Sequence, residues 1–98
     1  MTLAPELASP AVVRRLASAG VVVAAGHTAG TYDEVASAVK AGLTGFTHLF
    51  NAMSQLGSRD PGAVGAALAC DGVWCSLIMD GVHAVSYTHL TLPTILRV

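Results

Sequence analysis

The chain has 98 residues, a formal net charge of −1, 53% hydrophobic residues and 11% charged residues. This composition excludes intrinsic disorder, which requires low hydrophobicity and high charge. The five Lys and Arg residues form no basic stripe, so we expect no nucleic-acid partner. Neither a membrane span of roughly 20 apolar residues nor a secretory leader is recognisable, and the sequence therefore predicts a cytoplasmic protein that is not inserted in a membrane.

Capping signals mark the expected helices. Ser9 precedes a proline and is typical of an N-cap, and Gly20 lies where that helix would end. Thr31 and Glu34 have the spacing of a capping box, and Gly42 would end the second helix. The predicted helices are 10–19, 32–41 and 60–69.

Short apolar runs lie between these helices. The run 21–25 begins with three β-branched valines and is apolar at every position, which is typical of a parallel strand covered on both faces. The predicted strands are 2–4, 21–25, 44–49 and 73–79. Strands that alternate with helices predict an α/β fold with parallel strands. Because a complete (β/α)8 barrel needs about 250 residues, we expect a partial TIM-type barrel of about three to four βα units.

Three histidines, His27, His48 and His83, lie near or just after the ends of successive predicted strands. The carboxyl ends of parallel strands converge on one face, where active sites of such folds lie. A single histidine there is more often structural, but three at equivalent places favour a metal site, because imidazole is a common ligand of zinc and related ions.

Polar side chains accompany these histidines. The amide of Asn51 both donates and accepts hydrogen bonds, which suits an amide or a sugar hydroxyl. Arg59 lies in the loop after the His48 strand, and its guanidinium fork matches a phosphate or carboxylate. On spacing alone, a solvated arginine paired with Asp60 is the simpler interpretation.

Four motifs occur in order: Gly26-His27-Thr28, the block Phe46–Met53, the block Arg59–Gly65 and the block Asp80–His83. Together they resemble the N-acetylglucosamine-6-phosphate deacetylase family of the amidohydrolase superfamily. The resemblance runs from residue 2 to about residue 84. We therefore assign residues 1–85 to the central part of an amidohydrolase barrel domain, and predict that residues 86–98 are a non-native or unstructured tail.

The resemblance implies that His27 and His48 are ligands of a divalent metal ion, with zinc as the first choice. It also implies hydrolysis of the acetamide of N-acetylglucosamine 6-phosphate, which yields glucosamine 6-phosphate and acetate, by a homodimeric parent protein in which Arg59 reaches across the interface to the phosphate. The residues implied to bind the substrate are Asn51, Ala52, Arg59, Asp80, Gly81, Val82 and His83.

Two parts of the family's machinery match no position in this sequence. They are a glutamate metal ligand and the catalytic aspartate, so we assign no catalytic residue and expect the fragment itself to be inactive. Two alternatives stay open. One is another amidohydrolase that acts on a different N-acyl sugar or a cyclic amide, and the other is a non-catalytic α/β fragment that binds a sugar phosphate or a metal.

Overall fold

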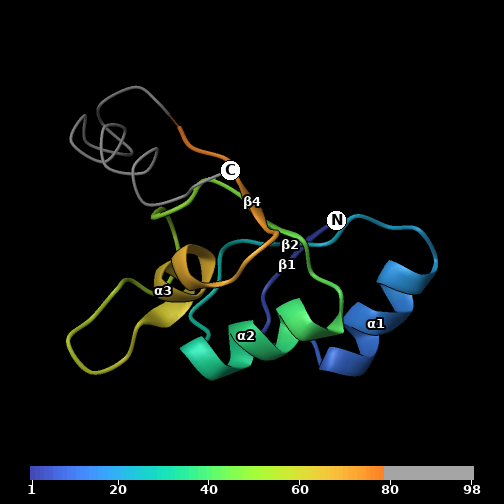
Figure 1. The fold of residues 1–98 in the computed structure, drawn as a ribbon, viewed down its shortest axis with the longest axis horizontal. Helices are drawn as coiled ribbons and strands as arrows, with labels where there is room; N and C mark the ends of the chain where they lie inside the picture. The colour runs from blue at the N-terminus through green and yellow to red at the C-terminus, as the bar shows by residue number, and fades with distance from the viewer. Residues whose placement is uncertain (79–98) are drawn as a thin grey trace.

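The computed structural model describes residues 1–78, and the predicted tail at 86–98 lies outside that range. Strands and helices alternate along the described chain (Figure 1). The elements are β1 (Thr2–Leu3), α1 (Pro10–Ser18), β2 (Ala24–Ala25), α2 (Tyr32–Ala41), β3 (Gly45–Phe46), α3 (Gly62–Ala69) and β4 (Trp74–Cys75). All neighbouring strands are parallel and the sheet order is β1-β2-β3-β4. The predicted α/β class with parallel strands is confirmed.

The capping signals act as predicted in the first two helices. Ser9 Oγ accepts a hydrogen bond from the Val12 N–H of α1 at 3.4 Å. In the capping box of α2, the Glu34 N–H donates to Thr31 Oγ1 at 3.2 Å, and the Thr31 N–H donates to the Glu34 carboxylate at 2.9 Å. Gly42 ends α2 with a φ of 125°, a conformation that favours glycine.

The third helix begins later than predicted. It starts at Gly62 rather than at Asp60, and no side chain caps it. The carboxylate of Asp60 accepts a hydrogen bond from the Tyr32 N–H of α2 at 3.4 Å instead. Gly62 has a φ of 65°, and a Cβ there would lie 2.8 Å from the carbonyl oxygen of Ser54, so the chain turns tightly at this point.

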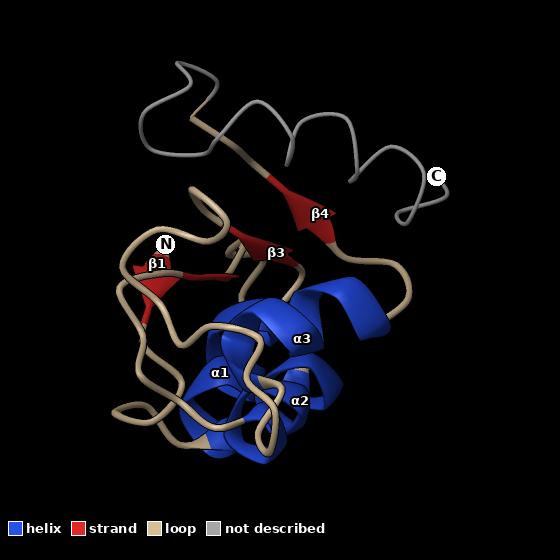
Figure 2. Cartoon of the chain, turned by 90° about the vertical axis from the view of Figure 1, so that its left-hand side faces the viewer, coloured by secondary structure: helices blue, strands red, loops and turns tan. Residues whose placement is uncertain are grey.

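The strands are much shorter than predicted, and the helices lie on only one side of the sheet (Figure 2). The run 21–25 contributes only Ala24–Ala25, and Val22 is 59% exposed whereas Val23 is fully buried. Helices α1, α2 and α3 all lie on the same side of the sheet (Figure 2). Ala24 and Ala25 point to opposite faces of β2 and are 4% and 0% exposed, so the expectation of a strand buried on both faces holds for these two residues.

The strand register places residues in two rows. Because side chains alternate along a strand, residues that pair across the sheet share a face. One row is buried or packed against the core, and consists of Leu3, Ala25, Phe46 and Cys75. The other row consists of Thr2, Ala24, Gly45 and Trp74. Ala24 and Gly45 of this row are buried, whereas Trp74 on the edge strand β4 is 44% exposed.

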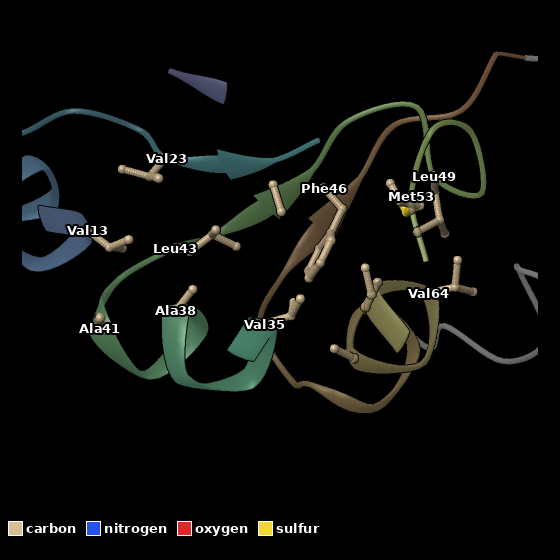
Figure 3. Packing of buried hydrophobic residues seen from close by; sticks show 14 residues of the cluster. Val13, Val23, Val35, Ala38, Ala41, Leu43, Phe46, Leu49, Met53 and Val64 are labelled. Atoms are coloured by element: carbon tan, nitrogen blue, oxygen red, sulfur yellow. The ribbon is translucent and has the colours of Figure 1, made fainter. Parts of the chain in front are cut away.

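The hydrophobic core lies between the sheet and the helices (Figure 3). Phe46 contributes its largest fully buried side chain, and Met53 packs in the same cluster. Cys70 and Cys75 are both partly exposed. No helix within residues 1–78 is long and apolar enough to cross a membrane.

Gly45 offers a test of how tightly the sheet is packed. A Cβ at this position would overlap the indole ring of Trp74, its partner in the register. We expect Gly45→Ala to lower the free energy of unfolding by about 1–3 kcal/mol, the usual cost of overpacking. The measurement is urea unfolding of the wild-type and variant chains.

The double variant Gly45→Ala/Trp74→Ala is the control for this prediction. If the indole causes the clash, Gly45→Ala should cost much less in the Trp74→Ala background than in the wild type. Equal costs in the two backgrounds would contradict the proposed contact.

Candidate metal and substrate site

The candidate site lies at the carboxyl edge of the sheet. Residues 4–9, 26–31, 47–61 and 76–78 directly follow β1, β2, β3 and β4 respectively. The parallel order of the strands brings these four segments to the same edge.

His27 and His48 come together at this edge. Their ring centroids are 4.7 Å apart with an interplanar angle of 81°, which is an edge-to-face contact. The predicted approach of these two histidines is confirmed. Their binding of a metal ion stays a prediction, and His83 lies outside the described residues.

The ring of His48 is oriented by its own loop. Its Nδ1 lies 3.0 Å from the backbone carbonyl oxygen of Asn51. A carbonyl oxygen only accepts, so Nδ1 carries the proton and donates in this hydrogen bond. The lone pair of the neutral ring is then on Nε2, which is the arrangement of histidine ligands in metal sites.

Both histidines have left-handed backbone conformations. The φ angle is 49° at His27 and 33° at His48, and two further residues of the His48 loop, Phe50 and Ala52, have φ angles of 78° and 50°. Such conformations cost of order 1–3 kcal/mol each in non-glycine residues and persist only where the surrounding structure imposes them. They are concentrated here in the loops that carry the site.

Hydrogen bonds from β4 hold the His48 turn. The His48 N–H donates to Ser76 Oγ at 2.9 Å, and the Leu49 N–H donates to the carbonyl oxygen of Ser76 at 2.8 Å. The strand next to β3 therefore fixes the point at which the His48 loop leaves the sheet.

Gly26 allows the loops of β1, β2 and β3 to approach closely. A Cβ at this position would overlap the Thr47 hydroxyl and would lie 2.8 Å from the Thr2 methyl group. The glycine of the Gly26-His27-Thr28 motif is thus required by close approach, since its φ is not in the left-handed range.

A hollow of about 440 Å³ opens beside the histidines. Its lining residues are His27, Thr28, Ala29, Ala52, Met53 and Ser54. Backbone from the loops after β2 and β3 meets here, because Thr28 and Met53 form a parallel bridge and the Ser54 N–H donates to the Thr28 carbonyl oxygen at 3.0 Å. The volume is in the range of pockets that hold small molecules.

The predicted substrate residues are only partly brought together. Ala52 lines the hollow, whereas Asn51 is half-buried and its side-chain amide donates to the Leu49 carbonyl oxygen at 3.4 Å. Arg59 is exposed on the loop before α3 and is not among the lining residues. The block Asp80–His83 lies outside the described residues.

Glu6, for which no motif predicts a role, also reaches this edge. Its carboxylate accepts hydrogen bonds from Thr28 Oγ1 at 2.5 Å and from the Ala29 N–H at 2.7 Å. Burial alone would raise the pKa of Glu6, but these two bonds and one from its own backbone together lower it below the ordinary value. The only sequence signal is a glutamate placed soon after β1, and spacing cannot show which loop it reaches.

The residues present fit part of a metal site. Two neighbouring imidazoles, one of them with a defined tautomer, are a suitable nitrogen donor pair for a divalent ion. Within residues 1–78, however, no group of three or more His, Cys, Asp or Glu side chains is close enough to hold a metal ion. Catalytic zinc sites use three protein ligands, so the pair is an incomplete set.

Known proteins resemble this chain in sequence. No family model matches it. An N-acetylgalactosamine-6-phosphate deacetylase from Shewanella sp. is 46% identical over 85% of this chain and 21% of its own length. An N-acetylglucosamine-6-phosphate deacetylase from Bacillus subtilis is 41% identical over 86% of this chain and 22% of its own length.

The solved structures agree with the sequence matches. The crystal structure of N-acetyl-D-glucosamine-6-phosphate deacetylase from Mycobacterium smegmatis superposes with a TM-score of 0.91 at 40% identity, over 96% of this chain and 25% of that one. The predicted resemblance to the N-acetylglucosamine-6-phosphate deacetylases is confirmed. A mutant of the same deacetylase, solved in complex with N-acetyl-D-glucosamine-6-phosphate, gives the same TM-score, identity and coverage. The present chain thus spans about a fifth to a quarter of the length of the deacetylases it matches.

The hydrogen bonds to Glu6 predict a pH dependence of stability. A carboxyl group whose pKa is lowered by folding stabilises the fold above its unfolded pKa, and this contribution is lost as the pH falls through the folded value. We therefore expect Tm to fall between about pH 5 and pH 3, and to fall less in Glu6→Gln than in the wild type. Thermal unfolding followed by circular dichroism at stepped pH measures this difference.

The comparison with Glu6→Gln isolates this residue, because the other carboxyl groups titrate in both chains. Parallel acid profiles for the two chains would show that the two hydrogen bonds do not stabilise the ionised form.

Proposed function

We propose that this chain supplies two metal-ligating histidines and part of the substrate pocket of an N-acetylhexosamine-6-phosphate deacetylase. The reaction is hydrolysis of the acetamide of N-acetylglucosamine 6-phosphate to glucosamine 6-phosphate and acetate. The observation that carries the proposal is the edge contact of His27 and His48 beside the hollow, at the carboxyl edge of a parallel sheet. The deacetylase relatives support it, although the chain spans only part of their length.

His27 and His48 would hold a divalent ion, for which we propose zinc. A bound ion of this kind lowers the pKa of water and polarises an amide carbonyl. The chain's own contribution is orientation: the Asn51 carbonyl oxygen fixes the His48 ring, and Ser76 fixes the backbone that carries it. The sugar would lie against one wall of the hollow, which is formed by Ala52, Met53 and Ser54.

The choice between two epimeric sugars is part of the proposal. Relatives named for N-acetylgalactosamine 6-phosphate and for N-acetylglucosamine 6-phosphate are both similar to this chain, at 46% and 41% identity respectively. The parent protein is therefore expected to act on one or both of these N-acetylhexosamine phosphates. Turnover of the two substrates, compared side by side, identifies the preferred one.

Zinc binding by this chain tests the metal proposal. Loss of a residue that hydrogen-bonds to a metal ligand weakens metal binding by roughly 10–100-fold. We expect His27→Ala and His48→Ala, which each remove a ligand itself, to weaken Zn²⁺ binding by more than this. Competition with a chromophoric chelator measures the affinity. His89→Ala is the matched control, since we interpret Thr88-His89-Leu90 as a chance repeat of Thr47-His48-Leu49. An equal loss in all three variants would show adventitious histidine binding and would contradict the proposal.

Arg59 is the proposed phosphate ligand, and its exposure on a loop outside the hollow is compatible with reaching into the site of a second subunit. In the parent protein, Arg59→Ala should raise KM for the phosphorylated substrate by about 10- to 150-fold, because a charge-assisted hydrogen bond contributes about 1.5–3 kcal/mol. Hydrolysis of unphosphorylated N-acetylglucosamine should hardly change, since that substrate makes no such bond.

The matched control is Arg15→Ala on helix α1, which removes the same charge from another exposed position. Equal loss of activity on both substrates in Arg59→Ala would contradict the phosphate assignment.

A further inference from the structure

Glu6 spans two units of the fold. It follows β1, yet both of its carboxylate oxygens accept hydrogen bonds from the two residues that come directly after His27. Thr28 Oγ1 donates to Oε1 at 2.5 Å and the Ala29 N–H donates to Oε2 at 2.7 Å. A bidentate carboxylate is thereby fixed on the His27 turn, and neither oxygen is left without a donor.

Thr28 also makes hydrogen bonds to other residues of the site edge. Its side chain is only 2% exposed, and its hydroxyl also accepts the Gly30 N–H at 3.0 Å. Its carbonyl oxygen accepts the Ser54 N–H, and Ser54 Oγ in turn donates to the Gly30 carbonyl oxygen at 2.6 Å. Thr28 therefore connects Glu6 to the loop that follows His48.

The His27 turn requires such a restraint. Its φ of 49° is a conformation that a histidine adopts only at a cost, and the ring itself is exposed to solvent. Burial of the side chain therefore does not hold the turn. The two residues after His27 donate hydrogen bonds to Glu6, and these bonds tie the turn to the segment after β1.

We propose that Glu6 is a positioning residue of the metal site, which acts through Thr28 and Ala29 to hold the imidazole of His27 against that of His48. The inference rests on the proposed function for the role of the two histidines. It assigns Glu6 no place among the metal ligands, because both of its oxygens already accept hydrogen bonds from the His27 turn.

Two nearly isosteric changes test this role. Glu6→Gln replaces one acceptor oxygen by an NH2 group, which then faces either the Thr28 hydroxyl or the Ala29 N–H, so one of the two hydrogen bonds is lost. Thr28→Val keeps the buried volume but removes the hydroxyl, whereas Thr28→Ser keeps the hydroxyl and should restore the wild-type behaviour.

Glu34→Gln is the matched control for charge. Like Glu6→Gln, it removes one negative charge and a carboxylate that accepts a hydrogen bond from a backbone N–H. Glu34, however, belongs to the capping box of α2, where glutamine can replace glutamate. An effect of net charge on cation binding would be shared by the Glu6 and Glu34 variants, and an effect of positioning would not.

Two measurements are made on the 98-residue chain and its variants. The first is the through-space NMR contact between the ring protons of His27 and His48, measured in the absence of metal. If a variant only lost overall stability, its folded molecules would still show this contact. The second is the affinity for Zn²⁺ by chelator competition. Circular dichroism establishes that each variant is folded under the conditions used.

We expect Glu6→Gln and Thr28→Val to lose the ring contact and to bind Zn²⁺ about 10–100-fold more weakly, while Thr28→Ser and Glu34→Gln match the wild type. If Glu6→Gln does not fold, the Thr28→Val and Thr28→Ser pair decides the question. If the ring contact is unchanged in Thr28→Val and Glu6→Gln, the inference is overturned. It is also overturned if Glu6→Gln loses Zn²⁺ binding while the ring contact stays intact, because Glu6 would then be a metal ligand. Failure of the wild type to bind Zn²⁺ overturns the proposed function instead, and the ring contact still tests the positioning role.

Discussion

The structure depends on parallel strand pairing that is only two residues long. Each strand pairs over only two residues, so few ladder hydrogen bonds hold the four units together. That register nevertheless fixes which side chains face the helices and brings all four strand ends to one edge. Phe46 shows the consequence, because it is fully buried in the row that packs on the helices, while the following residues leave the sheet to form the His48 loop.

Polar contacts between the loops supplement this short ladder. Thr28 and Met53 continue the parallel pairing beyond β2 and β3 as a single bridge, and Ser54 links the Thr28 turn to the start of α3 through the Ala63 N–H, which donates to Ser54 Oγ at 2.8 Å. A buried hydroxyl with all its hydrogen bonds satisfied specifies one arrangement of the backbone, whereas apolar packing tolerates several. The loops at the site edge are therefore an ordered extension of the sheet.

Local signals were sufficient for the first two helices and for the alternation of elements, but not for the start of α3. The capping box of Thr31 and Glu34 and the glycine at 42 each act within a few residues, and the structure has them as expected. Strand length depends on partners far along the chain, which is why the run 21–25 reads as a long strand but contributes two residues. The approach of His27 and His48 followed from strand order, but the contact of Glu6 with Thr28 spans 22 residues and leaves no pattern in the sequence.

Each histidine turn has hydrogen bonds of its own and is held in addition by a side chain from an adjacent strand end. Glu6 follows β1 and binds the turn after β2, while Ser76 follows β4 and accepts the N–H of His48 after β3. The left-handed conformations at both histidines therefore lie in turns that neighbouring units help to hold. The geometry of the histidine pair is for this reason a property of four assembled units. A single βα unit with the same histidine motif would lack both the neighbouring strand and the side chain that helps to hold the turn.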